Sequence, residues 1–483
     1  MSNASRIFKN TSYLLLARVV TIAIGIVTSI LTARYLGASG FGVLGFALAF
    51  TAIFGILVDF GLDLLTTREV AREHVLASEY LTNIVAMRLI LGGSFIALVA
   101  VLVNVLAYST LTIYVTLIIA FSVVLGTLGG TIAALFQAFQ KLQYMAAGLV
   151  LTSVLTVLGI SSVIVLRLSV LGFAYVYVIA NAITLAYYYI AYRIRFKLQR
   201  PKIEWEFWKR TIREAWPMAA LSISVMVYFR IDVVILSLFQ GAAQIGLYTV
   251  AYTISETSTI IPAMFMASLF PLISLMHQDS PRSFAETCAK SIKYMLYIAL
   301  PMAFTVTLWA PPVIALFYGQ AFAGSAVALQ IIIWSAAAMY VGIVLGNAFV
   351  SANLQKLGMK VTMGAMVFNI ILNILVIPKY GYWGASATTV ATETFIVCTS
   401  IFFLERYGYS LHVGSVIAVP FFGLGLISAI STVLLRLGIH LVLITALALL
   451  LYAATLWKLG LNEDDKRLIY SLLKNPRLFA PET

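Results

Sequence analysis

Long apolar runs, separated by short polar connections, constrain this chain more than any other feature of its sequence. Most of them reach or exceed the ~20 residues that a helix needs to cross a bilayer. Composition agrees, because 62% of the residues are hydrophobic and only 10% are charged, against about 25% charged in a soluble domain. We therefore predict an all-α polytopic membrane protein with about 14 transmembrane helices. The predicted spans lie near residues 10-36, 41-65, 81-106, 112-139, 145-166, 170-192, 215-239, 245-276, 291-317, 322-352, 357-377, 383-404, 414-435 and 439-459.

The distribution of lysine and arginine predicts the orientation of these spans. With the N-terminus inside, 24 basic residues fall in inner segments, three lie within spans and four fall outside. Because Lys and Arg accumulate in short cytoplasmic loops, we expect a multi-pass protein of the cell (cytoplasmic) membrane with both termini in the cytoplasm. The net charge of +13 is then explained by basic inner loops that face anionic membrane lipid. No nucleic acid partner is expected. The four outer residues are Arg34, Arg167, Lys379 and Arg436.

An internal duplication predicts how the spans are grouped. Residues Gly37–Leu44, GASGFGVL, recur as Gly241–Tyr248, GAAQIGLY, at an offset of 204, and two later landmarks recur at offsets of 215 and 212. Internal repeats are typical of secondary transporters, and an even number of spans per repeat makes the two halves parallel. We predict a six-helix bundle over 1-205, a second parallel-related six-helix bundle over 206-410, two additional helices over 411-459 and a cytoplasmic tail over 460-483.

The first copy of the duplicated corner also contains a GxGxxG pattern, at Gly40, Gly42 and Gly45. After a short strand, this pattern would suggest a dinucleotide site. Here a helix-length apolar run precedes the glycines, so we interpret them as a tight corner between two helices.

The sequence offers no pattern that indicates an enzyme, a metal site or a cofactor. The two cysteines, Cys288 and Cys398, and the four histidines are scattered. The GxxxxGK[ST] motif of ATP-driven motors is absent from the sequence. We therefore expect no catalytic residues, no metal ligands and no cofactor.

Two polar segments are predicted to form surface helices. In Arg193–Trp216, three tryptophans and Ile212 recur at helical spacing among Lys and Arg, which is typical of an amphipathic helix on the cytoplasmic surface. A solvated linker is the alternative interpretation. In the tail, Asn462 is a candidate N-cap that acidic residues and then Leu468, Ile469, Leu472 and Leu473 follow.

Charges inside predicted spans are costly, so they mark candidate functional residues. Arg18 and Arg88 lie near the cytoplasmic side, as do Asp59 and Asp63, which are four residues apart and are expected on one helix face. We predict that these four residues form an inner cluster. Alternatively, the arginine side chains extend to the membrane interface, and Asp63 pairs with Arg68.

A second predicted cluster comprises Arg230, Asp232 and Glu256, farther from the cytoplasmic side, while Glu393 stands apart. At this depth it is harder for Arg230 to reach the interface, which favours a functional role. A structural ion pair between Arg230 and Glu256 is the alternative.

Several motifs resemble those of a known family. The N-terminal part of the chain is similar to the signature of polysaccharide-biosynthesis membrane proteins, the O-antigen-type flippases of lipid-linked oligosaccharides. The residues that carry this resemblance are Arg34–Gly37, the Phe-Gly after it, Asp59–Leu62 and Thr67–Arg72. Arg230–Asp232, followed by Gly246–Tyr248, resembles the helix 7 and 8 region of that family. The family lies within the multidrug/oligosaccharidyl-lipid/polysaccharide exporter superfamily.

The resemblance implies both a fold and a function. The fold would be two six-helix bundles around a central V-shaped cavity that helices 1, 2, 7 and 8 line. The function would be translocation of a polyprenyl-linked oligosaccharide from the inner to the outer leaflet by alternating access, coupled to a cation, either a proton or sodium. Expected partners are then membrane lipid, the lipid-linked oligosaccharide, the coupling cation and glycan-assembly enzymes.

An anionic head group in a low-dielectric cavity needs cationic partners. We therefore predict substrate binding by Arg18, Arg88 and Arg230, and ion coupling or gating by Asp59, Asp63, Asp232 and Glu256. Two other functions remain open. One is a cation-coupled multidrug antiporter of the same superfamily, in which Asp59, Asp232 or Glu256 would bind the ion. The other is a non-transporting membrane scaffold for glycan assembly.

Overall fold

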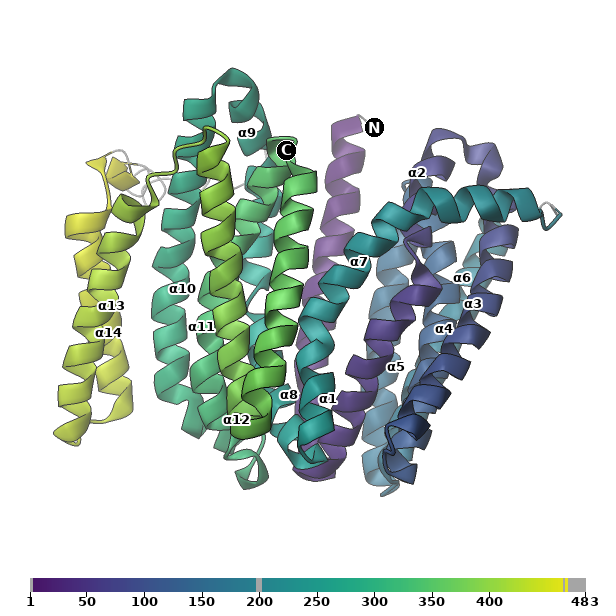
Figure 1. Cartoon of the computed structure of the whole chain (residues 1–483), viewed down its shortest axis with the longest axis horizontal. Helices are drawn as coiled ribbons and strands as arrows, with labels where there is room; N and C mark the ends of the chain where they lie inside the picture. Colours follow the sequence, from purple (N-terminus) through teal and green to yellow (C-terminus); the bar gives the residue numbers. More distant parts are fainter. Residues whose placement is uncertain (1–2, 197–201, 464, 468–483) are drawn as a thin grey trace. The chain divides into compact units, whose positions relative to one another are not determined.

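The computed structural model describes residues 3–196, 202–463 and 465–467, and the regular structure within these ranges is helical (Figure 1). Short 3-10 turns lie at His74–Leu76 and Gln320–Phe322, and a π-helical turn follows α14 at Leu456–Gly460. The helices are α1 (Asn3–Asp59), α2 (Leu62–Arg72), α3 (Ala77–Val105), α4 (Thr110–Ala138), α5 (Leu142–Val165), α6 (Val170–Arg195), α7 (Trp205–Phe239), α8 (Ala242–Thr257), α9 (Ile260–Asp279), α10 (Pro281–Phe317), α11 (Ser325–Ser351), α12 (Gln355–Arg406), α13 (Val413–Arg436) and α14 (Leu441–Thr455).

Twelve segments of the described chain are helical, long and apolar enough to cross a membrane. Two of them, Ser12–Arg72 and Gln355–Arg406, turn sharply inside, at Gly37 and Gly381, so each contains two of the predicted spans. With these two divided, each of the fourteen predicted spans overlaps one segment. The prediction of an all-helical polytopic membrane fold is confirmed.

The turn at Gly37 depends on the backbone freedom of glycine. Its φ is 64° and its ψ is 179°, a combination that a residue with a Cβ rarely adopts. Nothing lies within 4 Å of the position where a Cβ would be, so the dihedral angles rather than crowding require glycine. In Figure 1 the α1 ribbon runs down from the N-terminus and then turns back. The predicted helix–corner–helix arrangement is confirmed.

A second break corrects the prediction for the span at 41-65. Helix α1 ends at Asp59, Phe60 and Gly61 adopt φ angles of 46° and 73°, and α2 begins at Leu62. Two consecutive residues in the left-handed region cannot continue a right-handed helix. The expectation that Asp59 and Asp63 share one face of a continuous helix is therefore wrong.

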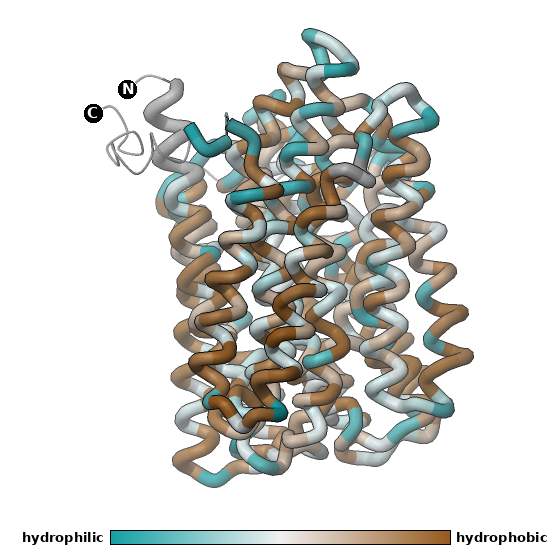
Figure 2. The backbone as a smooth tube through the Cα atoms, turned by 90° about the vertical axis from the view of Figure 1, so that its left-hand side faces the viewer, coloured by the Kyte–Doolittle hydropathy of each residue, from teal (hydrophilic) through white to brown (hydrophobic). Residues whose placement is uncertain are grey.

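Exposed apolar side chains support a membrane environment. Figure 2 shows hydrophobic residues along the middle of the helices and hydrophilic residues gathered towards their ends. Leu89, Ile179 and Leu450 are each more than half exposed. Such side chains are suited to contact with lipid tails, where the helical backbone satisfies its own hydrogen bonds.

One compact unit comprises the chain up to Val250 together with Ile314–Ser325 and Thr362–Thr388. Within it, α4 packs against α6, α1, α3 and α2. One apolar core of this unit contains the fully buried Phe136 with Tyr188 and Tyr192, and another contains Phe173 with residues of α1, α4 and α5. These cores hold the helices that carry the predicted inner cluster.

The second compact unit comprises Ala251–Val313, Ala326–Val361 and the chain from Thr389 onwards. Its apolar core is built mainly by α10 and α11, with contributions from α9, α13 and α14. Cys288 and Tyr340 are completely buried there. The division into bundles over 1-205 and 206-410 stays a prediction.

The predicted amphipathic helix forms the first part of α7, which begins at Trp205 and continues to Phe239. On one face of this part, Phe207 and Ala215 are buried, whereas Trp205 and Trp216 are 65% and 59% exposed. The solvated-linker alternative is therefore wrong for residues 205–216, and residues 197–201 lie outside the described ranges. A helix with exposed tryptophans among basic residues is typical of the membrane interface.

The predicted N-cap of the tail helix is also observed. The Asn462 N–H donates to Oδ2 of Asp465 at 3.2 Å, and the Lys466 N–H donates to the Asn462 carbonyl at 3.0 Å. This is the reciprocal contact by which a side chain at the third helical position satisfies the first residues of a helix. The apolar residues of the tail, Leu468, Ile469, Leu472 and Leu473, lie outside the described residues.

Candidate functional site

A polar cavity lies inside the first compact unit. Its volume is about 470 Å³, and α1, α2, α4, α5 and α6 contribute to its wall. Two charged side chains line it, Arg18 from α1 and Asp63 from α2. Small residues of α4, including Gly126, Gly129 and Gly130, leave room for the cavity. The uncharged polar residues of the wall are Thr21, Gln137, Thr152, Ser153, Asn181, Thr184 and Tyr188.

Arg88 of α3 pairs with both carboxylates of the predicted inner cluster. Its Nη2 lies 2.6 Å from Oδ1 of Asp59, and its Nη1 lies 2.9 Å from Oδ1 of Asp63. Nη1 also donates to Oγ1 of Thr131 at 2.6 Å and to the carbonyl of Thr127, both on α4. The Arg88 side chain is 0% exposed, so it does not extend to the membrane interface. It joins α1, α2, α3 and α4 at one point.

Unlike the buried side chain of Arg88, the side chains of Asp59 and Asp63 are accessible to solvent. Their side chains are 32% and 39% exposed, so each carboxylate contacts the buried guanidinium and still has an open side. Arg68 instead lies 2.5 Å from Glu69 and 3.0 Å from Glu214. The alternative pairing of Asp63 with Arg68 is therefore wrong.

The structure brings the four residues of the inner cluster together in two ways. Arg88 contacts Asp59 and Asp63 directly, whereas the exposed Arg18 shares the cavity wall with Asp63. With all four groups ionised, two positive and two negative charges balance. A cation that binds a carboxylate, or a proton that neutralises one, would leave the cluster with excess positive charge.

Asp232 of α7 is 3% exposed and binds a neighbouring helix. Its Oδ1 accepts from the Val233 N–H at 2.8 Å, and its Oδ2 accepts from the hydroxyl of Tyr248, a fully buried residue of α8. Asp232 thus joins α7 to α8. Arg230, half-buried, lies two residues earlier on α7.

Glu256, the third member of the second predicted cluster, lies near the C-terminal end of α8 and is half-buried. It belongs to the second compact unit, whereas Arg230 and Asp232 belong to the first. Glu393, on α12, is 4% exposed. The functional roles of Arg230, Asp232 and Glu256 stay predictions.

The two copies of the duplicated corner contact each other within the first unit. A Cβ on Gly42 would lie 1.7 Å from the carbonyl oxygen of Ala242, and a Cβ on Gly246 would lie 2.0 Å from the carbonyl oxygen of Ala38. The contact is therefore reciprocal, and glycine is required at both crossing points because any Cβ would overlap backbone. The two copies of the corner therefore pack backbone against backbone at these glycines.

Arg34, just before the first corner, binds a helix end that is distant in sequence. Its Nε donates to the Phe317 carbonyl at 2.7 Å, and its Nη2 donates to the Leu316 carbonyl. Close to it in sequence, Phe41 packs edge to face on Phe322, with ring centroids 6.0 Å apart. Both contacts are made by residues close in sequence to Gly42, on the side that the charge distribution predicts to be outside.

Sequence reasoning did not single out Thr127, Thr131 or Tyr248 as partners of the charged groups. Threonines are common in transmembrane helices, and no local pattern distinguishes the two that bind Arg88. For Tyr248 a signal existed, because it is the last residue of the second corner copy. Its bond to Asp232 depends on how α7 and α8 pack, which the repeat does not specify.

Comparison with known families gives two matches. A family model described as "Polysaccharide biosynthesis protein" matches residues 7–277. A second model, "MatE", matches residues 217–375. The first match contains both corner copies and all seven predicted site residues.

Two proteins of Haloferax volcanii are similar in sequence. "Probable low-salt glycan biosynthesis flippase Agl15" is 22% identical over 373 residues, which cover 74% of this chain and 75% of that protein. "Probable flippase AglR" is 25% identical over 173 residues, which cover 35% of this chain and 36% of that protein.

Solved structures share the fold. The structure titled "Lipid II flippase MurJ, inward closed conformation" has a TM-score of 0.72 at 13% identity, over 92% of this chain and 98% of that one. An inward-facing multidrug resistance MATE family transporter of the MOP superfamily has a TM-score of 0.66 at 15% identity, over 81% and 95% of the two chains. At these identities, the likeness establishes the architecture alone.

Proposed function

This chain belongs to the polysaccharide biosynthesis protein family, and from that premise we propose that it moves a polyprenyl-linked oligosaccharide from the inner to the outer leaflet. The family lies within the MOP superfamily of transporters, which are not enzymes. The match with Agl15 covers 75% of that protein, which is described as a "Probable low-salt glycan biosynthesis flippase". This supports a lipid-linked glycan as the substrate. The membrane is the cell membrane, with both termini in the cytoplasm.

The observation that carries this proposal is the charge arrangement in the first unit. Arg18 is an exposed cation on the wall of a polar cavity of about 470 Å³, and a phosphate or pyrophosphate head group needs such a partner. Arg88 is already bound by Asp59 and Asp63. Its contribution to substrate binding is therefore electrostatic and depends on whether those carboxylates remain ionised.

This arrangement suggests how a cation couples to the lipid substrate. The inner cluster has balanced charge, so a proton or a sodium ion on Asp59 or Asp63 gives it a net positive charge. The anionic head group then binds more tightly, and by linkage the bound head group raises the affinity for the cation by the same factor. The half-exposed carboxylates are open to such an ion.

Alternating access would require the corner crossing to open. The crossing of Gly42 with Gly246 and the contact of Arg34 with the end of α10 hold the predicted outer side of the first unit together. We propose that these contacts separate when the substrate leaves to the outer leaflet. During this transfer, Arg230 would bind the head group. The carboxylates of Asp232 and Glu256 would bind the coupling ion.

A flipping assay tests the proposal directly. The purified chain is reconstituted into liposomes with a fluorescent polyprenyl-pyrophosphate oligosaccharide, and a membrane-impermeant reagent reports how much lipid reaches the opposite leaflet. We expect transfer that depends on the protein and on a proton or sodium gradient. Glycan-assembly enzymes are proposed partners in the cell, but the assay does not require them.

A cation-coupled multidrug antiporter is the second candidate, because the MatE model matches residues 217–375 and the carboxylate of Asp63 lines the cavity of the first unit. The same liposomes distinguish it. Export of cationic dyes without transfer of the lipid-linked glycan would favour the antiporter. Failure of both activities in well-folded protein would favour a membrane scaffold.

A further inference from the structure

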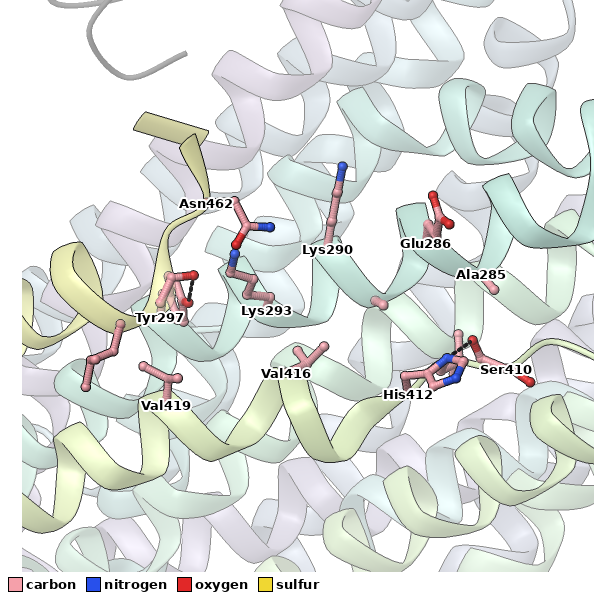
Figure 3. Close-up of a pocket in the computed structure, with 14 residues that line it drawn as sticks. Ala285, Glu286, Lys290, Lys293, Tyr297, Ser410, His412, Val416, Val419 and Asn462 are labelled. Atoms are coloured by element: carbon pink, nitrogen blue, oxygen red, sulfur yellow. Dashed lines mark hydrogen bonds between the residues drawn. The ribbon is translucent and has the colours of Figure 1, made fainter. Parts of the chain in front are cut away.

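A second pocket, in the second compact unit, has a basic mouth and an apolar wall. Its volume is about 390 Å³, and it lies between α10, the start of α13 and the turn after α14. Figure 3 shows Lys290 and Lys293 extending from α10, with Val416 and Val419 on α13 facing the same space. Its lining includes none of the predicted site residues and none of the residues that line the cavity of the first unit.

The positive charge of this pocket comes chiefly from Lys290. Lys293 Nζ lies 2.8 Å from Oδ2 of Asp465, so its charge is compensated. The acid on the wall, Glu286, lies 2.9 Å from Arg282. Lys290 is exposed, and among the described residues it makes no hydrogen bond or ion pair. A lysine without a partner beside a pocket is available to bind an anion.

The pocket is pre-formed by contacts between segments that are distant in sequence. The hydroxyl of Tyr297 donates to the Gly460 carbonyl at 2.8 Å, and the hydroxyl of Tyr294 donates to Oδ1 of Asp465 at 2.5 Å. These bonds hold the chain after α14 against α10. Opposite them, His412 has a φ of 44°, and its Nδ1–H donates to the Ser410 carbonyl at 3.1 Å. The imidazole therefore has a defined position on the pocket wall.

The apolar part of the wall argues for an amphipathic ligand. Val416, Val419 and Leu459 line the pocket together with the lysines, and α10, α13 and α14 all belong to segments that are long and apolar enough to cross a membrane. A free phosphate would gain nothing from these side chains, whereas the glycerol and first methylenes of a phospholipid would bury apolar surface against them. The helix ends concerned carry the basic residues that predict the cytoplasmic side, where anionic lipids accumulate.

We propose that this pocket binds the phosphate head group of an anionic phospholipid, with Lys290 as the cationic contact and α13 as the apolar wall. The site is distinct from the proposed translocation path, so it does not depend on the flippase proposal. The bound lipid would stabilise the contact of the chain after α14 with α10.

Binding is tested with the full chain in nanodiscs of phosphatidylcholine with or without phosphatidylglycerol, using native mass spectrometry to count retained lipids. We expect the protein to retain phosphatidylglycerol in preference to phosphatidylcholine. Lys290→Gln should weaken this retention about fivefold, the effect of roughly 1 kcal/mol per basic residue near a membrane surface. The control is Lys360→Gln, which removes an exposed lysine of α12 outside the pocket and should leave retention unchanged.

A second variant and a second ligand make the test decisive. Ala289→Asp places a carboxylate on the pocket wall and should abolish the preference for phosphatidylglycerol. Equal retention by Lys290→Gln, Ala289→Asp and the Lys360→Gln control would overturn the proposal. So would a thermal stabilisation by inorganic phosphate in phosphatidylcholine nanodiscs that equals the effect of phosphatidylglycerol, because the ligand would then be a soluble anion. These measurements need no transport, so they fail or succeed independently of the proposed function.

Discussion

Nη2 of Arg88 lies 2.6 Å from Oδ1 of Asp59, in a pair whose arginine is 0% exposed and whose aspartate is 32% exposed. If the arginine left this position, the Thr127 carbonyl and the Thr131 hydroxyl of α4 would lose the hydrogen bonds that they accept from it. The aspartate can exchange its partner, since part of its carboxylate is open. Asp63 offers the same guanidinium a second carboxylate at 2.9 Å, so Arg88 keeps a counter-ion if one aspartate binds a proton or another cation.

We predict that the two aspartates compensate for each other. Asp59→Asn and Asp63→Asn alone should each lower stability by about 1 kcal/mol, because the other carboxylate still pairs with Arg88. The double variant should lose about 3 kcal/mol or more, since a buried guanidinium then lacks any counter-ion. Thermal unfolding in detergent measures this. Additive losses in the double variant would show that the two carboxylates act separately.

Arg230 should contribute cationic charge to the head-group site. Arg230→Lys should retain part of the flipping activity and Arg230→Gln should lose nearly all of it, at unchanged membrane abundance. Activity in liposomes, normalised to reconstituted protein, is the measurement. If Arg230→Gln instead lowers abundance and leaves activity per molecule intact, the residue has a structural role. The positive charge of the cavity would then come from Arg18, with Arg88 acting through its carboxylates.

Opening of the corner crossing should be essential for transport. Gly42→Ala forces a methyl group against the Ala242 carbonyl and should destabilise this closed arrangement by about 1–3 kcal/mol, as overpacking does. Gly25→Ala, in the part of α1 before the turn at Gly37 and with open space around the site, is the control and should be neutral or slightly stabilising. Cross-linking cysteines introduced at Ala38 and Ala242 should stop flipping, and reduction should restore it. Full activity in the cross-linked protein would contradict alternating access at this corner.

Both termini should face the cytoplasm. In a variant without Cys288 and Cys398, single cysteines at Ser2 and Lys474 should resist an impermeant maleimide in intact cells and react after lysis. A cysteine at Arg167, in a predicted outer connection, should react in intact cells and serves as the control. Labelling of either terminus from outside would overturn the topology.

Acid should weaken the contact between the chain after α14 and α10. Burial alone would raise the pKa of Asp465, but hydrogen bonds from Lys293, Tyr294 and the Asn462 N–H hold it below the usual value. A pKa that is lower in the folded state stabilises the contact at neutral pH, and this stabilisation is lost as the pH falls below about 4 and through the lowered pKa. Thermal unfolding between pH 7 and pH 3 measures the loss.

Two variants separate this contact from general acid effects. Asp465→Asn should remove much of the pH dependence, because its side chain cannot titrate. Glu463→Gln removes a neighbouring carboxylate that also pairs with a lysine, Lys466, but is exposed, and should change the pH dependence less. Identical pH profiles for the two variants would contradict a specific role of Asp465.

Much of the architecture follows from local sequence. The lengths of the apolar runs predict the fourteen spans, since crossing a bilayer requires a continuous apolar helix. The glycine-rich corner at Gly37 and the amphipathic start of α7 were predicted for the same kind of reason, because dihedral freedom and helical periodicity are properties of neighbouring residues. The charges in the spans also pointed to Arg18, Arg88, Asp59 and Asp63 as one cluster.

Only the tertiary structure decided how these groups are used. The break at Phe60 and Gly61 moves Asp63 off the helix of Asp59, yet both carboxylates reach Arg88 because α1, α2 and α3 pack together. The reciprocal crossing of Gly42 and Gly246 likewise depends on which helices meet, and so does the position of Lys290, which has no partner among the described residues, at the mouth of its pocket. Hydropathy and spacing report one chain segment at a time, whereas an ion pair or a close backbone crossing is set by the packing of segments far apart in sequence.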